Sequence, residues 1–161
     1  MLKKTNNIFL IFLLFIISAS LIAAFIIQYE LGHQPCKLCI YQRIPYILSI
    51  FLIIELIFFK KNEKTTLLLL SLIFIIGAAL AFYHLGIEQG FFSESFVCES
   101  KDFSENLSKE QLLKQLKQNT LSCKDVSFKI LGLSLASINS IFSLILSVIF
   151  LKLFLNYGKN Q

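Results

Sequence analysis

At 161 residues, 56% of them hydrophobic and 17 of them phenylalanine, with a mean hydropathy of +0.73, this chain is far more apolar than an average soluble domain. Its formal charge of +5 comes from basic residues scattered over short connections and one mixed-charge loop. A nucleic-acid-binding protein would concentrate such charge in one block. Composition therefore excludes an ordinary soluble domain, argues against nucleic acid as a partner and predicts an integral membrane protein.

The first apolar run covers residues 8–27, twenty residues without a charge, which is about the length that crosses the hydrocarbon core. We expect it to be the first membrane span. A basic start and the small residues at 18–20 also resemble a cleaved signal peptide, but the run continues to full spanning length. On either interpretation the chain emerges on the outer side just before Cys36.

Residues 35–43, Pro-Cys-Lys-Leu-Cys-Ile-Tyr-Gln-Arg, form a polar island at the end of an outward loop expected over 28–40. Cys36 and Cys39 are three positions apart, a spacing that suits a strained, easily exchanged disulfide or a shared metal ion. Arg43 follows four residues after the second thiol and can stabilise a thiolate. The island is therefore the first candidate for chemistry.

The second span is expected over residues 41–59. Pro45 is tolerated best in the first turn of a helix, which predicts a helix that begins near Arg43. Cys39 would then lie just before that helix, with its thiolate facing the positive end of the helix dipole.

Glu55 is the one acid inside a span, and it lies close enough to the interface to snorkel or pair, which is the favoured interpretation over a functional role. The basic connection at 60–66 leads to a third span expected over 67–85. Small residues at 77–81 in this span suit close helix packing, although they are equally ordinary helix composition.

Segment 86–129 is polar and holds six lysines, seven acids and the remaining cysteines, Cys98 and Cys123. A capping-box pattern followed by leucines predicts a short amphipathic helix near 108–116. The fourth span is expected over 130–155. The expected fold is all-α, a single four-helix membrane bundle with a polar loop between spans three and four.

With four spans, all four cysteines lie on one side of the membrane. Counts of Lys plus Arg, seven for the termini and second connection against eight for the cysteine side, do not decide which side that is. The second connection packs three lysines into seven residues, whereas the long loop balances its lysines with acids. The positive-inside rule then favours a cytoplasmic second connection and cysteines that face a disulfide-permitting compartment.

Three uses of these cysteines compete. Zinc sites usually combine two close pairs, and the 24 residues between Cys98 and Cys123 lack a companion histidine motif, which argues against a metal. A bridge between these two would staple the loop, contributing about 3 kcal/mol, but leaves the close pair unexplained. A redox relay is favoured, in which the pairs exchange a disulfide and pass electrons to a lipid-soluble quinone, one of whose oxygens Arg43 can polarise.

The motif at 35–43, the four-span pattern and the second cysteine pair resemble the disulfide bond formation protein B (DsbB) family over the whole chain. Residues 83–90, Tyr-His-Leu-Gly-Ile-Glu-Gln-Gly, and 128–136 resemble a common variant of the family, while Gln42 stands where the family often has an acid. The resemblance implies a quinone-dependent protein-disulfide oxidoreductase of the bacterial inner membrane, with its cysteine loops in the periplasm. We expect it to be a monomer.

By that resemblance, Cys98 is attacked by a reduced DsbA-like, thioredoxin-fold partner, and Cys123 is its loop partner. Cys123 then exchanges with Cys36, and Cys39 passes the electrons to ubiquinone or menaquinone beside Arg43.

His84, near the outer end of the third span, can hydrogen-bond the quinone or supply a proton. Two other classes stay open at this point. A vitamin K epoxide reductase-type enzyme also couples thiols to quinones, although that family carries its close pair near a late span. A disulfide-stapled membrane scaffold would need no catalysis at all.

Overall fold

The computed structural model describes residues 6–59, 62–93, 98, 123–124, 128–130 and 132–159. Within these ranges the chain forms five helices and one short antiparallel β-hairpin. The elements are α1 Asn7–Tyr29, α2 Lys37–Tyr41, α3 Ile44–Phe58, α4 Glu63–Glu88, β1 Lys129–Ile130, β2 Leu133–Ser134 and α6 Leu135–Lys159.

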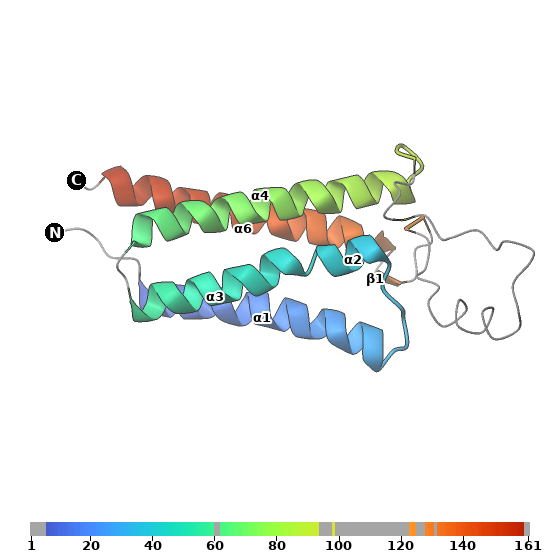
Figure 1. The fold of residues 1–161 in the computed structure, drawn as a ribbon, viewed down its shortest axis with the longest axis horizontal. Helices are drawn as coiled ribbons and strands as arrows, with labels where there is room; N and C mark the ends of the chain where they lie inside the picture. The colour runs from blue at the N-terminus through green and yellow to red at the C-terminus, as the bar shows by residue number, and fades with distance from the viewer. Residues whose placement is uncertain are drawn as a thin grey trace, which may run out of the picture.

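The helices form one elongated bundle (Figure 1). α4 packs along α6, α1 packs along α3, and α3 joins the two pairs by packing on α4. The start of α1 and the end of α6 lie at one end of the bundle, and α2 and the hairpin lie at the other. Four helical segments, counting α2 and α3 as one, are long and apolar enough to cross a membrane. The predicted all-α four-span bundle is confirmed, and the chain is a multi-pass membrane protein.

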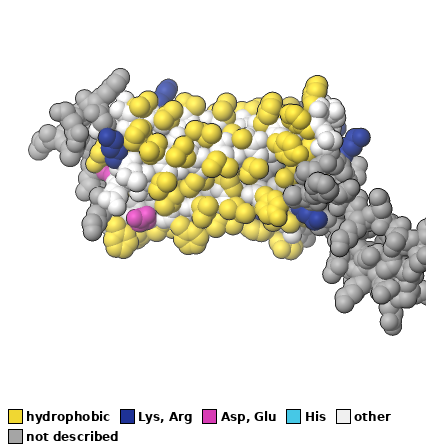
Figure 2. Space-filling model, turned by 45° about the horizontal axis from the view of Figure 1, so that its top comes forward, with side chains coloured by type: hydrophobic (Ala, Val, Ile, Leu, Met, Phe, Trp, Pro, Cys, Tyr) yellow, Lys and Arg dark blue, Asp and Glu magenta, His cyan; other side chains and the backbone are white. Residues whose placement is uncertain are grey.

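The bundle is apolar outside as well as inside. Its core includes Leu10, Ile17, Phe74 and Phe150, all almost completely buried. Large apolar side chains such as Phe15 are exposed instead, and Figure 2 shows hydrophobic side chains along the whole length of the bundle, with Lys and Arg toward its two ends. Such a surface is stable only against lipid, because in water this much exposed apolar area would drive aggregation.

The second span is not one continuous helix. α2 ends at Tyr41, and α3 begins at Ile44, so that Pro45 falls in its first turn, where a missing backbone N–H costs nothing. This confirms the predicted helix start. The prediction that Cys39 lies just before the helix is wrong, because the chain forms a separate helical turn, α2, ahead of the proline and Cys39 lies within it.

The fourth helix also begins later than the apolar run that was expected to span at 130–155. The chain reverses at Gly132, whose φ of +84° is open to glycine at little cost, and β1 and β2 pair around it. Ser134 then ends the hairpin and caps α6, since its Oγ accepts a hydrogen bond from the Ser137 N–H at 3.2 Å. The amphipathic helix predicted near 108–116 lies outside the residues that the structure describes.

Candidate thiol–disulfide site and its cavity

Cys36 occupies the N-terminal cap of α2. It follows Pro35 in an extended conformation, and its Sγ accepts a hydrogen bond from the Cys39 backbone N–H at 3.2 Å. A side chain at this position satisfies one of the unpaired amides of the first turn, and a negative charge there is favoured by the helix dipole. The thiol that faces the helix N-terminus is therefore Cys36 and not, as the sequence suggested, Cys39.

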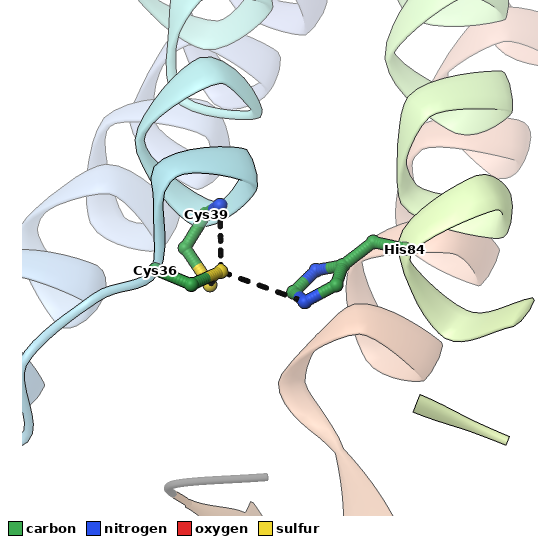
Figure 3. A group of neighbouring side chains, drawn as sticks. All are labelled: Cys36, Cys39 and His84. Carbon is green, nitrogen blue, oxygen red and sulfur yellow. Dashed lines mark hydrogen bonds between the residues drawn. The ribbon is translucent and has the colours of Figure 1, made fainter. Parts of the chain in front are cut away.

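The two thiols of the island face each other and a histidine (Figure 3). The sulfur atoms lie 2.7 Å apart, and Cys36 Sγ lies 3.5 Å from His84 Nε2. Cys36 is 5% exposed, whereas Cys39 is half-buried. Both cysteines are unbonded, and the arrangement allows them to form or break a disulfide with little movement.

The Cys36 thiol is activated. The hydrogen bond from the Cys39 side chain lowers the pKa of Cys36 to about 5, and His84 acts in the same direction through a hydrogen bond and its charge. Burial opposes the shift but does not cancel it. At neutral pH Cys36 is consequently a thiolate, which is the form that attacks disulfides and binds metals.

His84 connects the thiols to a polar network inside the bundle. Its Nδ1 lies 3.0 Å from the Gln42 side-chain nitrogen, and the Gln42 oxygen accepts a hydrogen bond from Asn139 at 2.7 Å. Asn139 Oδ1 in turn accepts from the Tyr46 hydroxyl, which also lies 3.1 Å from the Ser143 hydroxyl. The chain of contacts thus runs from α2 through α4 to α3 and α6.

Sequence reasoning singled out His84 but missed Asn139 and Tyr46. The available signal was the polar Asn139 within the fourth apolar run, because an amide inside a membrane segment must find partners. Only the folded bundle shows that Tyr46 and Gln42 are those partners.

Glu88 is a further residue to which sequence reasoning gave no role. It lies one turn after His84 on α4, with Oε1 3.6 Å from His84 Nε2 and only 6% of its side chain exposed. Its Oε2 is buried and has no hydrogen-bond partner among the residues that the structure describes. Glu55, by contrast, is exposed on the outside of α3, which agrees with the favoured interfacial interpretation.

The loop cysteines are joined to each other and lie next to the island. Cys98 and Cys123 form a disulfide, with their Cα atoms 5.4 Å apart, and both are buried. They belong to one apolar cluster with Cys36, Leu38 and Ile87, against which Cys39 also packs. All four cysteines that the sequence singled out therefore meet at one end of the bundle.

A cavity of about 350 Å³ adjoins the island. Cys39, Arg43 and His84 line it together, and its apolar walls come from α1 and α6, including Leu21 and Phe142. The structure thus brings Arg43 and His84 to the same cavity as Cys39.

Arg43 is held firmly at this cavity. Its guanidinium donates to Gln28 Oε1 at 2.6 Å and to the Ala24 carbonyl at 3.5 Å, and it stacks over the Phe25 ring at 4.8 Å. These contacts, all with α1, fix a positive charge beside an otherwise apolar space.

A membrane bundle that holds a disulfide beside two free, facing thiols and an apolar cavity defines a membrane thiol–disulfide oxidoreductase. The family model described as disulfide bond formation protein DsbB matches residues 6–153, nearly the whole chain, so the protein belongs to the DsbB family. This confirms the resemblance drawn from residues 35–43 and identifies a disulfide oxidoreductase associated with disulfide bond formation.

Two relatives are similar to this chain, and the printed name of one of them matches the family. "Disulfide bond formation protein B" of Xylella fastidiosa (strain Temecula1) is 29% identical over 118 residues, which cover 70% of this chain and 68% of that protein. "Uncharacterized protein RP370" of Rickettsia prowazekii (strain Madrid E) is 32% identical over 153 residues, which cover 92% of this chain and 88% of that protein.

Proposed function

We propose that this protein is a thiol:quinone oxidoreductase that reoxidises a DsbA-like periplasmic dithiol oxidase and passes the electrons to a membrane quinone. The single observation that carries the proposal is the shared cavity. Cys39, Arg43 and His84 line one apolar space inside the bundle, and the buried Cys98–Cys123 disulfide packs against the same thiols. One face of the site thus suits a lipid-soluble acceptor and the other a protein dithiol.

The residues around the cavity fit a quinone. Apolar side chains of α1 and α6 suit a ring that carries an isoprenoid tail, and Gln42, Arg43 and His84 line the same cavity as Cys39 and offer donors for ring oxygens. A bound quinone, ubiquinone or menaquinone, supplies an acceptor for two electrons and two protons.

Within this site Arg43 orients and polarises an oxygen of the quinone. Its contacts to Gln28 and Phe25 leave the guanidinium in one place, so no ordering is needed when an acceptor oxygen arrives. Cys39 lines the cavity together with Arg43, whereas Cys36 does not. His84 and Gln42 link that thiol pair to buried groups that can hold a proton.

The cysteines carry the electrons in two exchanges. A thiolate of the reduced partner attacks Cys98, the Cys98–Cys123 bond breaks, and a mixed disulfide forms. The second partner thiol releases the oxidised partner and leaves Cys98 and Cys123 as thiols. That pair then reduces an oxidised Cys36–Cys39 bridge, with Cys123 attacking Cys36, and the island dithiol transfers two electrons and two protons to the quinone.

We place the cysteine end of the bundle in the periplasm and the protein in the bacterial inner membrane. Support comes from the three lysines in the connection at 60–66, which favour a cytoplasmic position for the opposite end. Outward cysteines also match a compartment in which a disulfide persists.

Quinone turnover tests the proposal. Purified protein with a reduced DsbA-like partner and a soluble quinone should convert quinone to quinol with one partner disulfide formed per quinone. Cys39→Ser should abolish this turnover, because the island can then no longer form a disulfide. Turnover that persists in Cys36→Ser or Cys39→Ser would refute the relay.

Trapping tests the partner and the topology together. A partner variant that lacks its resolving cysteine should accumulate as a mixed disulfide at Cys98 when it is exported to the periplasm. The same variant retained in the cytoplasm is the matched control and should give no adduct. Bridges that never exchange with either form would indicate a stapled scaffold instead.

A further inference from the structure

Three metal-ligating side chains converge at the island, and a fourth lies next to one of them. Cys36 Sγ, Cys39 Sγ and His84 Nε2 all lie within 4.8 Å of one another. Glu88 extends the group, because its Oε1 lies 3.6 Å from the same His84 nitrogen. Its other oxygen, Oε2, is buried without a hydrogen-bond partner within the described part of the chain, so this carboxyl group has an unused ligand atom beside the cluster.

We propose that the reduced island binds one divalent cation of the zinc class through Cys36, Cys39, His84 and Glu88, and that this metal holds the protein in an inactive dithiol state. Two thiolates, an imidazole and a carboxylate are a donor set that a borderline-soft, tetrahedral ion prefers. The inference requires only that Cys36 and Cys39 be reduced, and it does not depend on quinone as the acceptor.

Two of the distances, from His84 to Cys36 and from His84 to Glu88, already approach those of a tetrahedral site. With Zn–S near 2.3 Å and Zn–N or Zn–O near 2.0–2.1 Å, tetrahedral angles require a sulfur-to-nitrogen separation of about 3.6 Å and a nitrogen-to-oxygen separation of about 3.3 Å. Cys36 Sγ and His84 Nε2 are 3.5 Å apart, and His84 Nε2 and Glu88 Oε1 are 3.6 Å apart.

The sulfurs must separate from 2.7 Å to about 3.8 Å to share such an ion. Cys39 is half-buried and borders the cavity, so rotation of its side chain has room to supply that movement.

The surroundings also support the imidazole as a ligand. To bind a metal through Nε2, His84 must carry its proton on Nδ1, which then needs an acceptor. Gln42 lies 3.0 Å from Nδ1, and its amide can present oxygen as well as nitrogen. Asn139, which contacts the other end of that amide, can exchange donor and acceptor in the same way.

Binding is a proton-release step and not a redox step. Any thiol of the pair that is still protonated loses its proton to solvent as the sulfur–metal bond forms, and no electrons move because Zn²⁺ has no accessible second oxidation state. Since both sulfurs are then occupied, the pair cannot close a disulfide until the ion leaves. The sequence did not indicate this site, because it suggested the four cysteines as one possible set of metal ligands. The fold instead groups Cys36 and Cys39 with His84 and Glu88 of α4.

Cobalt and zinc titrations test the site. The full-length Cys98→Ala/Cys123→Ala variant in detergent leaves the island as its only thiols, and after reduction it should bind one Co²⁺ per chain with thiolate charge-transfer and tetrahedral d–d absorption. Zn²⁺ should displace the cobalt stoichiometrically. His84→Ala and Glu88→Gln should each weaken zinc affinity at least about tenfold, whereas the matched controls His33→Ala and Glu55→Gln should leave it unchanged.

Wild-type protein provides a second readout that needs no cysteine replacement. Zinc should protect Cys36 and Cys39 of the reduced chain from alkylation, as mapped by peptide mass spectrometry, and a chelator should restore labelling. The proposal would be overturned by any of three results. The thiolate bands could be absent, the His84 and Glu88 variants could bind zinc as tightly as the protein without these changes, or protein with an oxidised island could bind zinc as well as reduced protein does. None of these outcomes depends on quinone turnover, so they are separable from a failure of the proposed function.

Discussion

At the residue scale, the two thiols of one short motif have different surroundings. Cys36 caps α2 and contacts His84, whereas Cys39 lies one turn further on and borders the cavity. The first environment stabilises a thiolate through a helix N-terminus and hydrogen bonds, and the second places the thiol at the wall of the cavity. Residue spacing alone predicts a reactive pair but not which member has which environment.

The reactivity of Cys36 should depend weakly on pH. Its pKa is lowered to about 5 from about 8.5 for an ordinary thiol, so the thiolate is present above the lowered value and is lost only as the pH falls through it. In the reduced Cys98→Ala/Cys123→Ala variant, the rate of Cys36 alkylation, corrected for the reagent, should stay level from about pH 8 to about pH 6 and fall near pH 5.

Cys39→Ala removes the largest cause of that shift and is the informative comparison. The midpoint for Cys36 should move upward, toward the value of a free thiol. Identical pH profiles in both proteins would contradict the assignment of the hydrogen bond as the cause.

Replacing Arg43 should lower the kcat/KM for quinone more than the kcat/KM for the protein dithiol. Arg43→Lys retains the charge but not the forked contacts to Gln28 and Ala24, so the kcat/KM for quinone should fall by about 10- to 100-fold, the equivalent of one charged hydrogen bond. The kcat/KM for the dithiol partner should change little.

Lys37→Gln serves as the control, because Lys37 is close in sequence but does not line the cavity. Steady-state kinetics with each substrate varied in turn separate the two effects. An equal loss of kcat/KM for quinone in Arg43→Lys and Lys37→Gln would point to general surface charge instead of a specific contact.

At the element scale, breaks and close approaches position the site. Pro45 forces a new helix start, and the turn before it leaves α2 free to present both thiols toward α4. Gly77 lets α3 and α4 approach, since a Cβ at that position would lie 3.3 Å from Pro45 Cγ and 3.8 Å from Ser143 Oγ. The small-residue patch of the third span is thus a packing surface at this glycine.

Gly77→Leu should destabilise the bundle by about 1–3 kcal/mol, because the added side chain has no space between the helices. Gly77→Ala should cost less, as only a few tenths of an ångström must be accommodated. Thermal unfolding in detergent, followed by helical circular dichroism, measures both. Ala79→Leu, on an exposed face of the same helix, should be close to neutral, and a comparable loss there would contradict the packing argument.

At the scale of the whole molecule, the fold joins two cysteine pairs that are far apart in the chain. The Cys98–Cys123 disulfide closes a loop of sequence separation 25 and lies buried against the island at one end of a bundle that is apolar along its length. An exchange between a protein substrate and the membrane interior needs both features, a bridge near the polar end and a cavity between the helices.

Cys98→Ala/Cys123→Ala should separate catalysis from stapling. If the loop pair is a relay, this variant should lose turnover with a protein dithiol yet still reduce quinone with a small dithiol that reaches Cys36 directly. Stability should fall by about 3 kcal/mol at most, the loop-closure contribution. Loss of both activities together with unfolding would instead indicate a structural role for the bridge.

The sequence by itself determined the membrane bundle and singled out the candidate reactive residues. Twenty-residue apolar runs must be helices in lipid, because no water is present to satisfy their backbone groups. Pro45 predicts a helix start near its own position, because proline is tolerated best in the first turn of a helix. The motif at 35–43 likewise indicates that its two cysteines and its arginine are candidates for chemistry, whatever the rest of the chain contains.

Only the tertiary structure decided which partners these residues have. The contact of Cys36 with His84 joins positions 48 residues apart, and the contact of Gln42 with Asn139 joins positions 97 residues apart. Local pattern carries no information about such contacts, because they arise when α2 packs against α4 and Gln42 meets α6. The reason is physical: a helix is specified by hydrogen bonds within itself, whereas a site between helices is specified by the faces they bury together.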